Sequence, residues 1–491
     1  MSPLAPLLTA ALLAAAVAAL LPDAARHRTP GSLAVWPGAA AAALALIGLA
    51  LALATGDDVA GAALTALIVT LTLVVQVFAS RHLRGDPRSR RFFALSSLAA
   101  LGSTVAIAAG DVVLLAAGWT LATVSTVALI ASAGAGAQTR VAVRRSAVSL
   151  AVGDAALWGA VLVAVASTGS TSLRALGGLD EMSATVVGLL VAVAAIARAG
   201  SFPLHGWLPA TAATTTPVSA LLHAGFVNAG ALLLLRFATV PSVAGLWLVG
   251  LAGAVTMILA TLAMLTRPDV KGRLVHSTAA QMGFLLLACA LGAYGLAIVH
   301  AIGHALFKAS LFLGAGSAVE HALRAHASGR TTPSHRGAVA GAATVLAVGA
   351  TALVATGALT HATAVLLLFA LATATVAGAR IGASSSPVAT RIALLATLAA
   401  AVLGYVAVVF PAAETLVAAP GAMALPPALA VAVFVCALLS ALAIRGSGPL
   451  ADRLFAVAFA WGRPPLPAST PRHPSWATAP AAGPLEYRRV S

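Results

Sequence analysis

The chain has 491 residues, of which 60% are hydrophobic and only 8% are charged. A soluble domain carries roughly a quarter charged residues, so this composition excludes a soluble globular protein and indicates an integral membrane protein. The net charge of +15 is spread over short loops and the C-terminal stretch, which argues against a nucleic-acid partner. Two cysteines, Cys289 and Cys436, offer neither a disulfide framework nor zinc-ligand spacing. We expect no metal and no cofactor in this chain.

Apolar runs long enough to cross a bilayer as helices recur throughout the chain. They predict an all-α polytopic membrane protein of about fifteen transmembrane helices. The predicted spans lie near residues 4–22, 33–54, 60–80, 92–110, 112–132, 147–167, 184–206, 217–236, 243–265, 275–292, 294–318, 338–358, 362–380, 391–410 and 427–444. The first run lacks the basic region of a secretory signal, so we expect a retained helix there.

Basic residues alternate between the predicted loops. Arginines follow spans one, three, five, nine, eleven and thirteen, whereas residues 56–58 are acidic and 411–426 contain no basic residue. The positive-inside rule therefore predicts a cell (inner) membrane protein with its N-terminus outside and its C-terminus cytoplasmic. The Pro-rich sequence from Trp461 onward is typical of a flexible tail, and residues 450–461 before it are expected to lie on the membrane surface.

The stretch from 198 to 230, RAGSFPLHGWLPATAATTTPVSALLHAGFVNAG, predicts an interrupted helix near 198–217. Pro203 and Pro209 break the helical pattern, and Pro217 suits the first turn of a new helix. At membrane depth a broken helix is tolerated only beside a water-filled or protein-lined cavity.

Arg198 and His223 flank this break inside predicted spans, where ionisable side chains are functional candidates. His205 and Trp207 are better explained as interfacial anchors. Asp154 lies within the sixth span and needs a cationic partner, for which Arg198 is the natural candidate.

Other titratable residues have weaker claims. Asp111 opens the fifth span and is either a helix N-cap or a functional group. Glu320 closes the eleventh span, where a structural and a functional role are equally well supported. His276 is a candidate relay member, although a hydrogen-bonded core histidine is the more frequent outcome for a lone one.

The segment HAIGHALFK places His300, His304 and Lys308 at positions i, i+4 and i+8, on one face of a helix. Lysine occurs only twice in the chain, at Lys271 and Lys308, against 26 arginines. Unlike arginine, a desolvated lysine loses its proton near neutral pH, and histidine does so without perturbation. We predict that this stripe transfers protons; a structural polar face is the simpler alternative. The pair HAIGH lacks the Glu of a zinc-protease motif.

Three longer motifs resemble the proton-pumping membrane subunits of NADH–quinone oxidoreductase (subunit L type) and of Mrp-type cation/proton antiporters. They are SFPLHGWLPATAATTTPVSALLHAGFVNAG, DVKGRLVHSTAAQMGF and HAIGHALFKASLFLGAGS. The resemblance covers roughly residues 75–320 and implies two inverted five-helix repeats. It divides the chain into N-terminal helices at 1–91, an antiporter-like core at 92–380, C-terminal helices at 381–445 and a cytoplasmic Pro/Arg-rich tail at 446–491.

Within that family, HAGFVNAG is closest to the DabB-type membrane subunit of inorganic-carbon accumulation complexes. Thr120 stands where the pumping relatives have Glu, Arg198 stands where they have Lys, and no segment after residue 340 resembles their late lysine motif. The resemblance implies a transporter subunit and not an enzyme. Its partner would be a large cytoplasmic, zinc-binding subunit similar to a β-carbonic anhydrase (DabA type), which hydrates CO2 to bicarbonate while this chain carries H+ or Na+.

His223, His300, His304 and Lys308 are then the expected ion relay, with Arg198 a fixed charge balanced by Asp154. Two alternatives remain open. The chain is a proton-translocating subunit of a quinone reductase or Mrp-type antiporter, or it is a membrane anchor whose polar helix has no transport role.

Overall fold

The computed structural model describes residues 4–21, 29, 31–316, 334–357, 364–384, 386–416, 424–444 and 448–463. Within these residues every predicted apolar run contains a helix, and the only β-type pairing is an isolated bridge between Asp111 and Ser172. The helices are α1 (Ala5–Leu20), α2 (Val35–Thr55), α3 (Val59–His82), α4 (Ser89–Ala108), α5 (Val112–Ser132), α6 (Ala137–Thr168), α7 (Glu181–Arg198), α8 (Trp207–Ala210), α9 (Thr216–Ala224), α10 (Ala229–Arg236), α11 (Val243–Thr266), α12 (Val270–Ala290), α13 (Tyr294–Leu313), α15 (His335–Ala355), α16 (Ala364–Ala383), α17 (Val388–Gly404), α18 (Phe410–Leu416), α19 (Ala428–Ala443) and α20 (Pro449–Gly462).

The all-α polytopic fold is thus confirmed. Over the described residues, eleven helical segments are long and apolar enough to cross a membrane, and α1 and α19 are shorter apolar helices. The helix α12 is not among the eleven because polar side chains from Lys271 to Gln281 lower the hydropathy of its first half. That polar half lies beside the candidate site described below.

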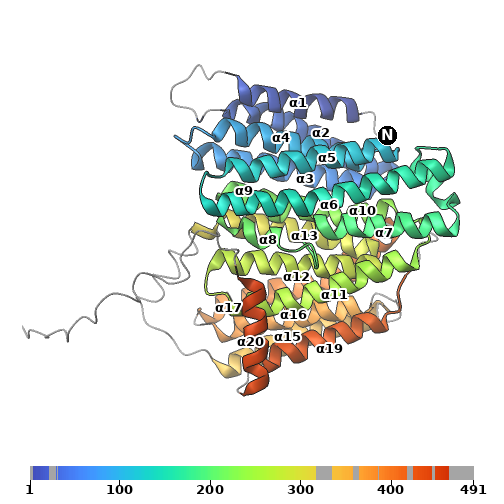
Figure 1. Ribbon diagram of the computed structural model, residues 1–491. Coiled ribbons are helices and arrows are strands. Elements are labelled where there is room, and N and C mark those ends of the chain that lie inside the picture. The colour runs from blue at the N-terminus through green and yellow to red at the C-terminus, as the bar shows by residue number, and fades with distance from the viewer. Residues whose placement is uncertain are drawn as a thin grey trace, which may run out of the picture.

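Most helices run side by side along one direction, with α1 to α5 at one side of the bundle and α15 to α19 at the other (Figure 1). This arrangement satisfies the backbone hydrogen bonds inside each helix, as the interior of a bilayer requires. The helix α20 crosses the others instead of running along them (Figure 1). Its direction agrees with the surface helix expected there, and residues 464–491 of the predicted flexible tail lie outside the described residues.

The chain leaves the helical conformation where the interruption was predicted. The helix α7 ends at Arg198, residues 199–206 are not helical, and α9 begins with Pro217 in its first turn. A second break follows at Phe226–Asn228, a single 3-10 turn between α9 and α10. The sequence did not predict this second break, which leaves backbone carbonyls at the end of α9 without partners inside that helix.

Glycine allows helices in the bundle to pack closely. A Cβ atom on Gly102 of α4 would lie 2.5 Å from the Ala122 nitrogen of α5, and one on Gly118 would lie 2.7 Å from the Gly102 oxygen. The pair Gly253 and Gly283 joins α11 to α12 in the same way. In a membrane, where lipid is as apolar as the helix surface, such small residues permit the close packing that holds helices together.

We predict that Gly102→Ala destabilises the protein by about 1–3 kcal/mol, because the added methyl group meets backbone atoms that have no rotamer to change. The thermal midpoint of the purified protein in detergent measures the effect. Gly48→Ala on α2 is the matched control, since nothing lies within 4 Å of a Cβ atom there. Equal losses in the two variants would contradict the close-contact explanation.

Candidate functional site

Arg198 is the last residue of α7 and is only 2% exposed. Its guanidinium carbon lies 3.7 Å from the centre of the Trp119 ring on α5 and 4.2 Å from the Phe226 ring at the second helix break. Two aromatic faces stabilise a buried cation through cation–π attraction. The guanidinium is therefore held between α5 and the α9–α10 break.

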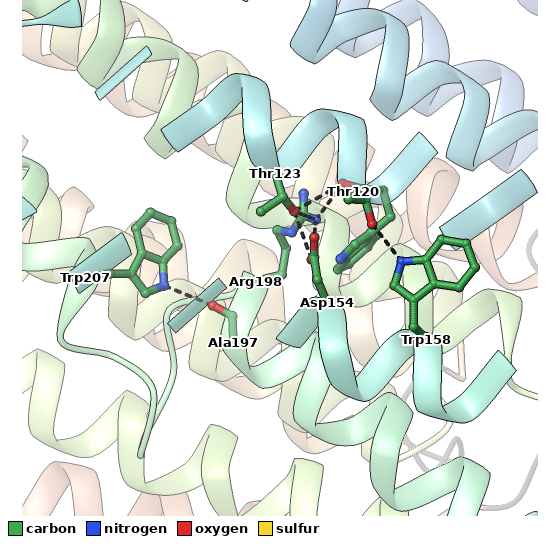
Figure 2. Close-up of polar contacts among 8 residues, drawn as sticks. Thr120, Thr123, Asp154, Trp158, Ala197, Arg198 and Trp207 are labelled. Atoms are coloured by element: carbon green, nitrogen blue, oxygen red, sulfur yellow. Dashed lines mark hydrogen bonds and ion pairs between the residues drawn. The ribbon is translucent and has the colours of Figure 1, made fainter. Parts of the chain in front are cut away.

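Arg198 and Asp154 of α6 were expected to pair. They form an ion pair in which Arg198 Nη2 lies 3.7 Å from Asp154 Oδ1 (Figure 2). Thr123 of α5 connects them: its hydroxyl accepts from Arg198 Nη2 at 2.7 Å and donates to Asp154 Oδ1 at 2.9 Å. Arg198 Nη2 also donates to the Trp119 carbonyl at 3.1 Å. Compensation by hydrogen bonds and an opposite charge is what makes a buried charge tolerable.

Thr120 lies in the same region of α5, and its hydroxyl accepts a hydrogen bond from Trp158 Nε1 at 3.0 Å (Figure 2). A threonine hydroxyl has no titratable proton in the physiological range. The position where pumping relatives are expected to carry a carboxylate therefore serves here as a hydrogen-bond acceptor for a tryptophan.

The predicted stripe lies on α13. Lys308 is 0% exposed and His304 is 3% exposed, while His300 is half-buried with its ring 6.2 Å from that of His304. Lys308 Nζ donates to the Leu274 carbonyl of α12 at 3.0 Å. The His300 Nε2 atom is buried and has no hydrogen-bond partner among the described residues. The stripe is thus turned toward protein and not toward lipid.

His304 connects three helices. Its Nε2 atom lies 2.9 Å from the backbone carbonyl of His223 on α9, and its Nδ1 atom lies 2.5 Å from Gln281 Oε1 on α12. The His223 carbonyl is free to accept because α9 ends one residue later, at Ala224. The second helix break therefore supplies a hydrogen-bond acceptor for His304 of the stripe.

The His223 side chain takes a separate direction. Its ring stacks on Phe312 with the centres 4.7 Å apart, and its Nε2 atom lies 3.2 Å from the Thr211 hydroxyl. Its Nδ1 atom is buried and has no partner among the described residues. The structure joins His223 to His304 through the backbone and not through the two rings.

The remaining candidates lie away from this stripe. His276 Nε2 is 3.2 Å from the Gly462 carbonyl at the end of α20, and the Trp461 ring stacks on His205 with 4.6 Å between centres. Asp111 caps α5: its Oδ1 accepts from the Val113 and Leu114 nitrogens at 2.8 and 2.9 Å. A side-chain hydrogen bond from Thr171, together with these backbone bonds, lowers the pKa of Asp111. Glu320 lies outside the described residues.

Sequence reasoning missed several contributors. Gln281 and Thr123 bind the titratable residues directly, and Trp119 and Phe226 enclose Arg198. A signal for Gln281 was present, because an amide inside an apolar span needs a partner. The aromatic residues carried no such signal, since Trp and Phe are ordinary in a membrane helix.

A small cavity of about 30 Å³ adjoins Arg198. Its lining includes Trp119, Ser103 and Asn228, and the Asn228 Oδ1 atom is buried without a hydrogen-bond partner among the described residues. A space of this size holds about one or two water molecules. Among the same residues, no group of three or more His, Cys, Asp and Glu side chains is placed to hold a metal ion.

Comparison with known proteins shows which proteins this chain is similar to. Residues 109–329 match the family model described as NADH:quinone oxidoreductase/Mrp antiporter, TM. The chain is 34% identical over 280 residues to the probable inorganic carbon transporter subunit DabB1 of Halothiobacillus neapolitanus, covering 55% of this chain and 50% of that protein. It is 40% identical over 198 residues to the probable DabB subunit of Hydrogenovibrio crunogenus, covering 37% of each.

A redox relative also matches: NADH-ubiquinone oxidoreductase chain 5 of Cryphonectria parasitica is 30% identical over 267 residues, covering 51% of this chain and 40% of that protein. Each of these alignments covers half or less of the curated relative.

Solved structures share the fold. The Mrp complex from Dietzia sp. DQ12-45-1b aligns with a TM-score of 0.57 at 24% identity, covering 93% of this chain and 55% of that one.

The membrane-bound sulfane sulfur reductase, an archaeal respiratory membrane complex, aligns with a TM-score of 0.58 at 19% identity, covering 94% of this chain and 97% of that one. The fold and the matched domain together define an antiporter-like, polytopic membrane protein. The predicted resemblance to the NADH–quinone oxidoreductase/Mrp antiporter family, and within it to DabB-type subunits, is confirmed. The relatives that carry it are named as transporter subunits and antiporter-like membrane domains, in agreement with a non-enzymatic transporter subunit.

We predict that Asp154→Leu destabilises the protein by about 3–5 kcal/mol, because it leaves the Arg198 cation buried without its counter-charge. The double variant Asp154→Leu with Arg198→Met should recover most of this loss, since no buried charge then remains. Thermal unfolding in detergent measures both. Asp57→Leu, at an exposed carboxylate between α2 and α3, is the control. Additive losses in the double variant would show that the pair is not coupled.

Proposed function

We propose that this chain is the membrane ion-translocating subunit of an energy-coupled inorganic-carbon pump. It carries H+ or Na+ down a gradient, and a zinc-binding, β-carbonic-anhydrase-like partner of the DabA type hydrates CO2 to bicarbonate. The observation that carries the proposal is the burial of His304 and Lys308 on one face of α13, hydrogen-bonded to α12 and to the end of α9.

Titratable side chains inside a membrane protein are costly and are kept where ions or protons move. Lys308 is bonded to a single carbonyl, and no carboxylate among the described residues forms an ion pair with it. Desolvation favours the neutral form of a lysine in such surroundings. Lys308 and His304 therefore have the chemistry of a proton relay. His300 extends the relay along α13, and His223 adjoins it at the end of α9.

The charge pair Arg198–Asp154 serves the relay differently. Arginine does not lose its proton under physiological conditions, and Trp119, Phe226 and Thr123 hold its guanidinium in place. We assign Arg198 as a fixed positive charge next to the helix breaks. Since Thr120 carries no titratable proton, we assign proton exchange to the stripe on α13 and to the adjoining His223 of α9.

The names of the relatives support the assignment of ion transport and CO2 hydration to two separate subunits. Those at 34–40% identity are named as inorganic carbon transporter subunits, and the structural neighbours belong to multi-subunit membrane complexes. We therefore assign the hydration chemistry to a separate subunit, in which a zinc-bound water attacks CO2. A proton-translocating subunit of a quinone reductase or an Mrp-type antiporter is the second candidate, favoured by the 30% identity to a chain 5 subunit.

We retain the predicted organisation and orientation as part of this proposal. Residues 92–380 form the antiporter-like core of two inverted repeats, and the N-terminus lies outside the cell membrane. The ends of α11 and α20 near Arg267 and Gly462 then face the cytoplasm. His276 lies at that end, where it is a secondary candidate for the entry of the ion path.

We predict that Lys308→Arg abolishes function, because arginine keeps the positive charge but does not exchange its proton. Growth in air of a carbonic-anhydrase-deficient host carrying this gene and its zinc-protein neighbour measures the outcome. Lys271→Arg is the matched control, since Lys271 lies in the first turn of α12 with its Nζ on the Thr214 carbonyl, and it should retain growth. Normal growth of the Lys308→Arg strain would refute the relay.

We predict that the chain, purified with its native neighbours from a mild detergent, carries with it a large zinc protein in a defined ratio. Mass spectrometry of the complex and metal analysis measure this. Recovery of quinone-reductase or Mrp-type subunits without zinc would refute the carbon assignment and support the second candidate.

A further inference from the structure

Gln281 lies where it can respond to the charge of His304. Its Oε1 atom is 2.5 Å from His304 Nδ1, while the His223 carbonyl is 2.9 Å from His304 Nε2. With the amide oxygen turned toward the ring, both neighbours are acceptors, and this orientation suits the charged imidazolium, which carries hydrogen on both nitrogens.

The neutral ring needs a different partner at one nitrogen. The carbonyl of His223 is fixed in the backbone and only accepts, so the Nε2 hydrogen stays in place in both charge states. The proton that His304 gains and loses is therefore the one on Nδ1. After its loss, Nδ1 becomes an acceptor and requires a donor in place of Gln281 Oε1.

Gln281 can supply that donor by a half turn of its amide, which exchanges the oxygen and the NH2 group. The surroundings suit both orientations. In the present one, Gln281 Nε2 donates to the Ser277 hydroxyl at 3.3 Å, one helical turn earlier on α12. In the other, the same hydroxyl rotates and donates to the amide oxygen, because serine both donates and accepts. Neither orientation leaves the amide unsatisfied.

The charges around His304 make the Gln281 oxygen important for the protonation of His304. Among the residues that the structure describes, the titratable groups that face it are His300 and Lys308 on its own helix and His223 on α9, while α12 presents the uncharged Gln281 and Ser277. All three titratable neighbours are basic, so each opposes a positive charge on His304. A carbonyl oxygen at Nδ1 favours the charged form and offsets part of that repulsion.

We propose that Gln281 is a positioning residue of the relay, whose amide turns over each time His304 gains or loses a proton at Nδ1. The proton comes from a neighbouring group of the stripe, Lys308 or His300, which loses one positive charge as His304 gains it. This inference rests on the proposed function of the stripe. It adds that α12 follows the charge state of α13 through one side chain.

The test is solid-state NMR of the full-length protein in lipid, with 15N-labelled histidine and the His304 signals assigned by their loss in His304→Gln. In the wild type, Nε2 should carry hydrogen at every pH and Nδ1 only at low pH. Gln281→Glu should hold Nδ1 protonated to a pH about one unit higher, because a carboxylate is a stronger acceptor. Gln281→Leu should shift the same transition about one unit lower.

Gln76→Leu is the matched control, since Gln76 is a buried amide bonded to Ser96 and Ser97 in a different part of the bundle. Its His304 titration should equal that of the wild type. A neutral His304 with hydrogen on Nδ1, or a titration unmoved by both Gln281 variants, would overturn the proposal. The NMR experiment tests the role of Gln281 by the protonation of His304, whereas the growth assay of Lys308→Arg tests the proposed function. A failure of one is therefore distinguishable from a failure of the other.

Discussion

The hydrogen bond from His304 to the carbonyl of His223 is the interaction on which the rest of this site depends. A bilayer interior offers no water to a carbonyl at the end of a helix, so a break such as that between α9 and α10 needs partners from neighbouring helices. The imidazole of α13 is one such partner. It provides a partner for the carbonyl of the broken helix, and in the proposed relay the same bond leaves Nδ1 as the nitrogen that exchanges a proton.

A second constraint operates on the other side of the break. Phe226, within the 3-10 turn after α9, covers one face of the Arg198 guanidinium, and Trp119 covers another. The break is thus shared between a fixed cation and a titratable stripe. Electrostatic coupling between the two is expected from their common position, since the field of a buried charge is weakly screened in a medium of low dielectric constant.

Much of this architecture could be predicted from the sequence. Spans of the right length, the interruption after Arg198 and the common face of His300, His304 and Lys308 follow from hydropathy, proline and helical periodicity. The pairing of Asp154 with Arg198 followed from the cost of an isolated buried charge. The second break at Phe226–Asn228 was not predicted, because the sequence around it contains no proline and reads as a continuous apolar helix.

The sequence by itself determined that this is a helical membrane protein with a titratable stripe and a charge pair, because the low polarity of lipid restricts where such residues occur. Only the tertiary structure decided what each group binds. In the folded protein, His304 is bonded to a backbone carbonyl and a side-chain amide, the His223 ring stacks on Phe312, and Asp111 caps a helix. These choices depend on contacts between residues far apart in the chain, which local periodicity and hydropathy do not encode.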